Sequence, residues 1–140
     1  MGRPVQIAID CAAPARLAQF WAEVLGYHLA GPPAGYASWQ EFSSAVGGPD
    51  EEWNAVVDPA GTGPRVFFHR VPEHKVVKNR VHLDIRIAPA GTPKEERRPL
   101  VDAEVARLIT MGATHARTDD DETDYFAVMQ DPEGNEFCVG

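Results

Sequence analysis

Near the start of the chain, residues 5–26 read VQIAIDCAAPARLAQFWAEVLG. The β-branched apolar run that opens this stretch predicts a strand, and Pro14 suits the first turn of a following helix. Apolar side chains then recur at the spacing of one buried helix face, and Gly26 is typical of a helix end. The residues of that face are Leu17, Phe20, Trp21, Val24 and Leu25. The stretch therefore predicts a strand, a turn and an amphipathic helix.

The same order returns in the second half of the chain. Residues 80–88 read RVHLDIRIA, whose alternation predicts a strand, and residues 90–99 are predicted to form a polar loop. A helical stripe follows and ends at Gly112. Its members are Val101, Val105, Leu108 and Ile109. The repetition indicates two copies of one half-domain unit that share a core.

Further short strands are predicted beside each helix. They lie at 36–42, 53–58 and 65–71 in the first half, and at 114–117, 125–130 and 136–139 in the second half. We therefore predict an α+β fold of two tandem βαβββ modules that form a curved mixed or antiparallel sheet, an incomplete barrel, around a ligand groove. The modules are predicted at about 1–72 and 80–140 of a single domain that spans residues 1–140.

Charge and composition exclude several classes of protein. The 140 residues hold 13 Lys and Arg against 21 Asp and Glu, a net charge of −8, which argues against a nucleic-acid partner and favours cationic ligands. No window approaches the roughly 18 apolar residues of a membrane span, and the chain starts without a signal-like hydrophobic run. We therefore expect a cytoplasmic protein without a membrane partner. Cys11 and Cys138 show no motif spacing and are expected to be reduced thiols.

Strand alternation assigns side chains to the predicted groove. In the first strand of each module the apolar side chains face the core, which places Gln6 and His82 at matching groove positions; Asp84 lies on the same face as His82. In the last strand, Glu136 and Cys138 face the groove. When the two modules are superposed, Arg65 takes the position equivalent to Glu136. Phe67 and His69 lie further along the same strand, on the same face as Arg65.

Three of these side chains suggest a metal site. Gln6, His82 and Glu136 offer an amide oxygen, an imidazole and a carboxylate, a donor set that suits a divalent transition metal. Three protein ligands with open positions are typical of a catalytic site, in which Glu136 is also the candidate for proton transfer. The alternative is that the three are polar groups on a solvated sheet face.

Three segments resemble a known family. They are CAAPARLAQFWAEVLGY, VPEHKVVKNRVHLDI and the closing DPEGNEFCVG. Together they resemble the glyoxalase/bleomycin-resistance/extradiol-dioxygenase family, the vicinal-oxygen-chelate fold, over nearly the whole chain. The resemblance implies metal ligands on the first and fourth strands of each module, which are Gln6, His82 and Glu136 in this sequence. The fourth position falls on Arg65, whose guanidinium cannot ligate a cation.

The remaining candidates are residues for substrate binding. Arg65, Phe67 and Asp84 lie on the predicted groove face, and His69 lines the pocket or replaces the missing fourth ligand. Trp39 and Trp53 lie on predicted strands, where they either stack on a flat ligand or pack in the core.

Two principal functions stay open at this point. The first is a metal-dependent lyase, isomerase or dioxygenase that acts on a substrate with vicinal oxygens and holds nickel, zinc, iron or manganese. The second is a metal-free binding protein of the bleomycin-resistance kind, which sequesters a small, cationic aromatic ligand. Whether the protein is an enzyme therefore stays open, and so does a third function, partner regulation without small-molecule chemistry. The family resemblance also implies that the chain can pair into a homodimer.

Overall fold

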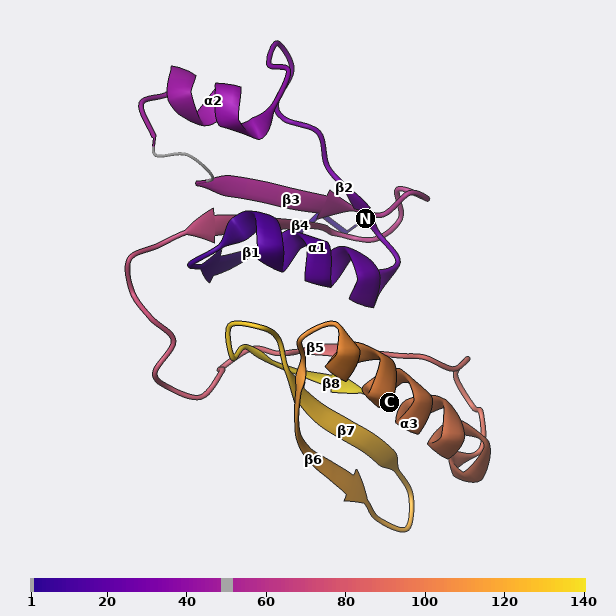
Figure 1. Cartoon of the computed structure of the whole chain (residues 1–140). Helices are drawn as coiled ribbons and strands as arrows, with labels where there is room; N and C mark the ends of the chain where they lie inside the picture. Colours follow the sequence, from indigo (N-terminus) through magenta and orange to yellow (C-terminus); the bar gives the residue numbers. More distant parts are fainter. Residues whose placement is uncertain (1, 49–51) are drawn as a thin grey trace. The chain divides into compact units, whose positions relative to one another are not determined.

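The computed structural model describes residues 2–48 and 52–140. The chain divides into two compact units, Met1–His74 (unit 1) and Lys75–Gly140 (unit 2). Each unit contains one four-stranded mixed sheet (Figure 1). The predicted α+β fold of two tandem βαβββ modules is confirmed. That the two modules form a single domain stays a prediction.

Unit 1 contains a sheet in the order β1-β4-β3-β2. The strands are β1 (Gln6–Cys11), β2 (His28–Leu29), β3 (Trp53–Val57) and β4 (Arg65–Arg70). β1 runs parallel to β4, and the other pairs are antiparallel. Helix α1 (Pro14–Leu25) packs on β3 and β4. The buried residues between them include Leu17, Phe20, Trp21, Val56, Val66 and Phe68.

Helix α1 forms where the apolar spacing predicts it. Pro14 occupies its first turn, and the helix ends at Gly26, whose positive φ of 66° belongs to the left-handed region that glycine adopts without strain. Leu17, Phe20, Trp21 and Val24 of the predicted apolar face are buried, and Leu25 is partly exposed.

The predicted strand at 36–42 is wrong. Trp39–Ala45 form helix α2, and the strand after α1 is the two-residue β2. The helix starts at Ser38, whose Oγ accepts a hydrogen bond from the Glu41 backbone N–H at 3.0 Å. The Glu41 carboxylate accepts in return from the Ala37 N–H at 2.5 Å. This reciprocal capping satisfies backbone donors that a helix start leaves unpaired, and it outweighs the strand preference of the aromatic residues.

Unit 2 contains the corresponding sheet, in the order β5-β8-β7-β6. The strands are β5 (Leu83–Ile85), β6 (Thr114–Asp120), β7 (Tyr125–Gln130) and β8 (Glu136–Val139). β5 runs parallel to β8, and helix α3 (Lys94–Thr110) packs on β6, β7 and β8. The core of unit 2 contains Val101, Leu108, Ala127, Met129, Phe137 and Val139.

Four predictions for unit 2 are wrong in detail. The first strand covers only 83–85 of the predicted 80–88, and Val81, assigned to the core, is 79% exposed. Ile109 of the helical stripe is also exposed. The predicted loop at 90–99 is helical from Lys94 onward, with Pro99 inside the helix. Glu95 and Glu96 in the first turn favour a helix start because carboxylates there interact with the positive end of the helix dipole.

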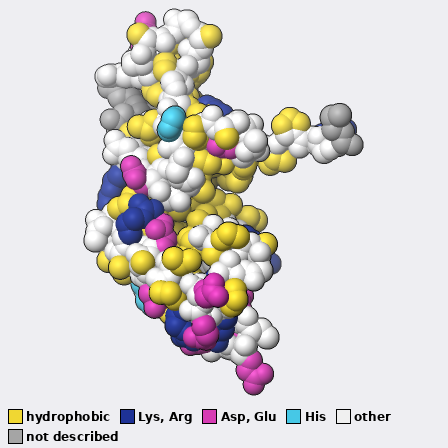
Figure 2. Space-filling model, turned by 90° about the vertical axis from the view of Figure 1, so that its right-hand side faces the viewer, with side chains coloured by type: hydrophobic (Ala, Val, Ile, Leu, Met, Phe, Trp, Pro, Cys, Tyr) yellow, Lys and Arg dark blue, Asp and Glu magenta, His cyan; other side chains and the backbone are white. Residues whose placement is uncertain are grey.

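Charged side chains of α3 pair with the neighbouring strand β6. Arg98 Nη1 lies 2.7 Å and Lys94 Nζ 2.6 Å from the carboxylate of Asp120. These contacts hold the pKa of Asp120 at about 2. On the surface of unit 2, Figure 2 shows Lys and Arg side chains beside Asp and Glu side chains. No helix among residues 2–48 and 52–140 has the length and apolar character needed to cross a bilayer.

The turn between β3 and β4 gives a pH-dependent prediction. The Asp58 carboxylate accepts backbone hydrogen bonds from Gly63, Ala60 and Thr62, and these bonds lower its pKa from 3.8 to about 2. Because the folded pKa is the lower one, this stabilisation is complete above pH 3.8 and is lost as the pH falls toward 2. We expect the urea midpoint to decline in this window, and to decline less in Asp58→Asn. An identical decline in both proteins would contradict the prediction.

Candidate functional site

The open face of the unit 2 sheet carries three side chains with metal-binding atoms. Asp84 on β5 pairs with Cys138 on β8, and His82 lies immediately before β5. Phe137 and Val139, the neighbours of Cys138 along β8, are fully buried. Because side chains alternate along a strand, Cys138 points to the opposite face. His82, Asp84 and Cys138 therefore share one face of the sheet.

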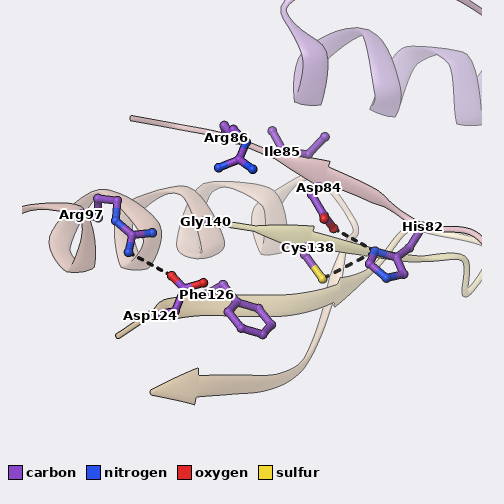
Figure 3. A pocket seen from close by; sticks show the side chains of 9 residues that line it. All are labelled: His82, Asp84, Ile85, Arg86, Arg97, Asp124, Phe126, Cys138 and Gly140. Atoms are coloured by element: carbon purple, nitrogen blue, oxygen red, sulfur yellow. Dashed lines mark hydrogen bonds and ion pairs between the residues drawn. The ribbon is translucent and has the colours of Figure 1, made fainter. Parts of the chain in front are cut away.

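Figure 3 shows Asp84 and Cys138 directed toward the imidazole of His82. His82 Nδ1 lies 2.8 Å from Asp84 Oδ1 and 4.0 Å from Cys138 Sγ. One donor atom from each of the three residues lies within 4.8 Å of the other two. Partial burial, and then the nearby Asp84 carboxylate, raise the pKa of the Cys138 thiol. Without a bound cation, Cys138 is thus a neutral thiol at neutral pH.

These three side chains form part of the wall of a pocket of about 220 Å³. The Phe126 ring and Ile85 give the pocket apolar surface, and Arg86 adds a positive charge (Figure 3). Arg97 Nη2 lies 2.9 Å from Asp124 Oδ1, and this hydrogen bond lowers the pKa of Asp124. The pocket can therefore hold a small organic molecule that has both apolar and polar groups.

Glu136, the first residue of β8, is bound to a cation of its own unit. Its carboxylate forms an ion pair with Lys78, and its backbone oxygen accepts from Asn79 Nδ2 at 3.4 Å. The hydrogen bond from Lys78 lowers the pKa of Glu136. Glu136 is therefore ionised at neutral pH, with its charge balanced by the ammonium group.

Gln6 in unit 1 is likewise bound to a positively charged side chain. Its Oε1 accepts a hydrogen bond from Arg65 Nη1 at 2.6 Å, and the two residues are direct partners in the β1–β4 pair. The guanidinium of Arg65 also lies over the Phe67 ring, 5.2 Å from its centroid. Burial lowers the pKa of Arg65, which stays a cation. The amide oxygen proposed as a metal ligand is thus already bound to a positive group.

The ring-bearing candidates His69, Trp53 and Trp39 have contacts within unit 1. The His69 ring stacks on Trp53 with centroids 6.2 Å apart, and its nitrogens lie 4.0 Å from Asp10 and 3.8 Å from Glu52. Trp39, on helix α2 rather than the predicted strand, donates its Nε1–H to the Ala30 carbonyl oxygen at 2.9 Å. These contacts orient the rings within unit 1.

The structure therefore distributes the predicted site residues over both units. Unit 1 contains Gln6, Arg65, Phe67, His69, Trp39 and Trp53, and unit 2 contains His82, Asp84 and Glu136. The grouping of Gln6, His82 and Glu136 around one ion stays a prediction. The sequence analysis did not include Cys138 or Phe126 among the site residues, and it did not predict the ion pair of Lys78 with Glu136. Alternation placed Cys138 on the correct face, but no spacing signal indicated that Lys78 binds Glu136.

Gln6, His82 and Glu136, called the trio below, do not fit a divalent metal in their present contacts. Arg65 occupies the amide oxygen of Gln6, and Lys78 occupies the carboxylate of Glu136. A divalent ion at these atoms would have to displace both cations, because like charges at such distances repel. His82 is the one member of the trio whose described contacts are to Asp84 and Cys138, which are themselves donor groups for metals.

Solved structures with the same fold include several proteins of related description. A glyoxalase/bleomycin resistance protein/dioxygenase family enzyme from Burkholderia phytofirmans PsJN has 16% identity and a TM-score of 0.63, over 96% of this chain and 94% of that chain. A possible glyoxalase from Bacillus cereus has 13% identity and a TM-score of 0.63, over 99% and 98%. At these identities the likeness shows the fold alone.

A third similar structure contains a metal. It is a mutant of the fosfomycin resistance protein FosX from Listeria monocytogenes, complexed with Mn(II) and 1S,2S-dihydroxypropylphosphonic acid. Its identity to this chain is 9% and its TM-score is 0.65, over 99% of this chain and 91% of that chain. No curated protein sequence matches this chain.

The family assignment rests on a sequence match over almost the full length. The family model described as "Glyoxalase-like domain" matches residues 6–140, which contain both βαβββ modules. The fold of both units and the solved structures agree with this match. This chain belongs to the glyoxalase-like domain family.

Proposed function

We propose that this chain binds a small organic compound in the unit 2 pocket, as a binding protein of the bleomycin-resistance kind. The observation that carries the proposal is the pocket of about 220 Å³ on the open face of the sheet, with the Phe126 ring among charges of both signs. Apolar lining with a few polar groups is typical of small-molecule sites. The lining includes Asp84 and Asp124 as well as Arg86 and Arg97, so it favours a ligand that carries polar groups beside an aromatic one.

The proposal leaves the trio without a metal. Arg65 on Gln6 and Lys78 on Glu136 supply positive charge at the two oxygen ligands. Neither Gln6 nor Arg65 is among the residues that line the unit 2 pocket. In this proposal Arg65 orders the open face of unit 1 by bridging Gln6 and Phe67.

Calorimetric titration of the full chain tests this function. The probes are bleomycin, fosfomycin, catechol and the hemithioacetal of methylglyoxal and glutathione. We expect catechol, the small aromatic probe, to bind, and Phe126→Ala to weaken that binding by roughly two- to tenfold, because an aromatic contact contributes about 0.5–1.5 kcal/mol. The matched control is Phe67→Ala, the same substitution on the open face of unit 1. Equal affinity of Phe126→Ala and the unchanged protein would contradict the proposal.

A second candidate is a metal-dependent lyase, isomerase or dioxygenase with Gln6, His82 and Glu136 as ligands. It is favoured by the FosX structure, which has the same fold and is complexed with Mn(II). A bound nickel, zinc, iron or manganese ion would polarise vicinal oxygens of a substrate. This candidate requires that Lys78 leave Glu136 and that Arg65 leave Gln6, because each cation occupies a ligand atom. Elemental analysis of Glu136→Gln separates the candidates, because only this one loses a stoichiometric metal in that variant.

A further inference from the structure

We infer that His82, Asp84 and Cys138 form a binding site for a thiophilic divalent cation such as Zn²⁺ or Co²⁺. The site lies in the wall of the unit 2 pocket and shares only His82 with the trio. The inference goes beyond the proposed function and holds whether or not an organic compound binds in the pocket.

The sheet holds the three donor groups in place. Asp84 and Cys138 are direct partners in the parallel β5–β8 pair, so their side chains leave neighbouring strands on one face. His82 precedes Asp84 by two residues, which puts it on the same face at the start of the strand. Their donor atoms already lie within 4.8 Å of one another. Little rearrangement is needed to bring them to one ion, since tetrahedral ligands of zinc stand roughly 3–4 Å apart.

The donor chemistry selects the cation. A thiolate, an imidazole and a carboxylate together suit zinc and cobalt, whereas magnesium and calcium prefer oxygen ligands alone. Thiolate and carboxylate each bring one negative charge, and together they neutralise a divalent ion. Three protein ligands leave a position of a tetrahedral ion open. Because the three residues line the pocket, that open position is accessible to a small molecule.

Unit 1 lacks the same donor groups at the matching positions. The parallel β1–β4 pair brings Ala8 beside Phe67, where the β5–β8 pair brings Asp84 beside Cys138. Neither Ala8 nor Phe67 has a side-chain donor atom, and Gln6 is bound to Arg65. The cluster is thus specific to the second module and is not a general consequence of the repeated sheet.

Cobalt titration of the metal-free full chain tests the inference. We expect one Co²⁺ per chain and the ultraviolet charge-transfer absorption of a cobalt–thiolate bond. Cys138→Ser should abolish the absorption and weaken Co²⁺ binding by at least roughly 100-fold, the upper end of what losing an outer hydrogen-bond partner of a ligand costs. The matched control is Cys11→Ala, which removes the other thiol, in β1 of unit 1, and should keep the absorption.

Further variants distinguish this site from the trio. Asp84→Asn should weaken Co²⁺ binding at least roughly tenfold while the thiolate absorption persists at saturation. Asp84 is exposed, so this variant decides the matter if circular dichroism shows that Cys138→Ser is unfolded. Absence of the thiolate absorption in the unchanged chain would overturn the inference. So would its persistence in Cys138→Ser, or loss of Co²⁺ in Glu136→Gln, which would assign the ion to the trio.

Discussion

Replacing Trp21 with alanine is expected to lower the free energy of unfolding by about 3–5 kcal/mol, the usual cost of deleting a buried aromatic side chain. Trp21 is 1% exposed, and its ring meets that of Phe20 edge-on with centroids 5.8 Å apart. The substitution removes contacts of α1 with the sheet of unit 1 and leaves a cavity that rigid strands cannot fill. Since small domains have only about 5–15 kcal/mol of stability, the loss is a large share of the total.

Urea unfolding followed by far-ultraviolet circular dichroism measures this effect without relying on the deleted fluorophore. The matched control is Gln19→Ala, on the exposed face of the same helix, which should change stability by less than about 0.5 kcal/mol. Equal unfolding free energies for Trp21→Ala and Gln19→Ala would show that α1 does not stabilise unit 1 as described.

Asp131→Ala is the second large expected effect, a loss of about 2–4 kcal/mol. Asp131 is 2% exposed in the turn between β7 and β8. Its Oδ1 accepts backbone hydrogen bonds from Glu133 at 2.9 Å and from Asn135 at 3.0 Å, and its Oδ2 accepts from Asn135 Nδ2 at 2.9 Å. Alanine removes the acceptors and leaves these donors unpaired near the sheet, which costs more than the hydrogen bonds alone contribute.

This turn also sets the start of β8, and with it the place of Glu136 and Cys138. The conservative variant Asp131→Asn keeps one acceptor oxygen and should lose clearly less stability than Asp131→Ala. Denaturant unfolding of both variants makes the comparison. Equal losses would mean that the buried charge, rather than the set of accepted hydrogen bonds, stabilises the turn.

Much of the fold could be predicted because local patterns and tertiary packing agree. In α1 the apolar spacing, Pro14 and Gly26 all indicate the same helix. Between Tyr36 and Phe42 two local signals disagree. The aromatic residues favour a strand, whereas Ser38 and Glu41 cap a helix. The capping hydrogen bonds prevailed there, and a search for the Ser-x-x-Glu pattern would have found them.

The sequence predicted on which face of the sheet the candidate side chains lie, but not which charged groups they bind. Alternation placed Glu136 and Cys138 opposite the buried Phe137, as the structure has them. The ion pair of Glu136 with Lys78 depends on the path of the segment before β5, for which the sequence has no regular pattern. A cytoplasmic location and a homodimer stay predictions.

The division into two units has a spectroscopic consequence. All three tryptophans, Trp21, Trp39 and Trp53, belong to unit 1, so fluorescence excited at tryptophan reports on the first module alone. Circular dichroism, by contrast, sees the helices and strands of both modules. Comparing the two transitions in one unmodified protein thus measures whether the repeated halves unfold as one cooperative body or in succession. The natural tryptophans thus serve as a fluorescent probe of unit 1.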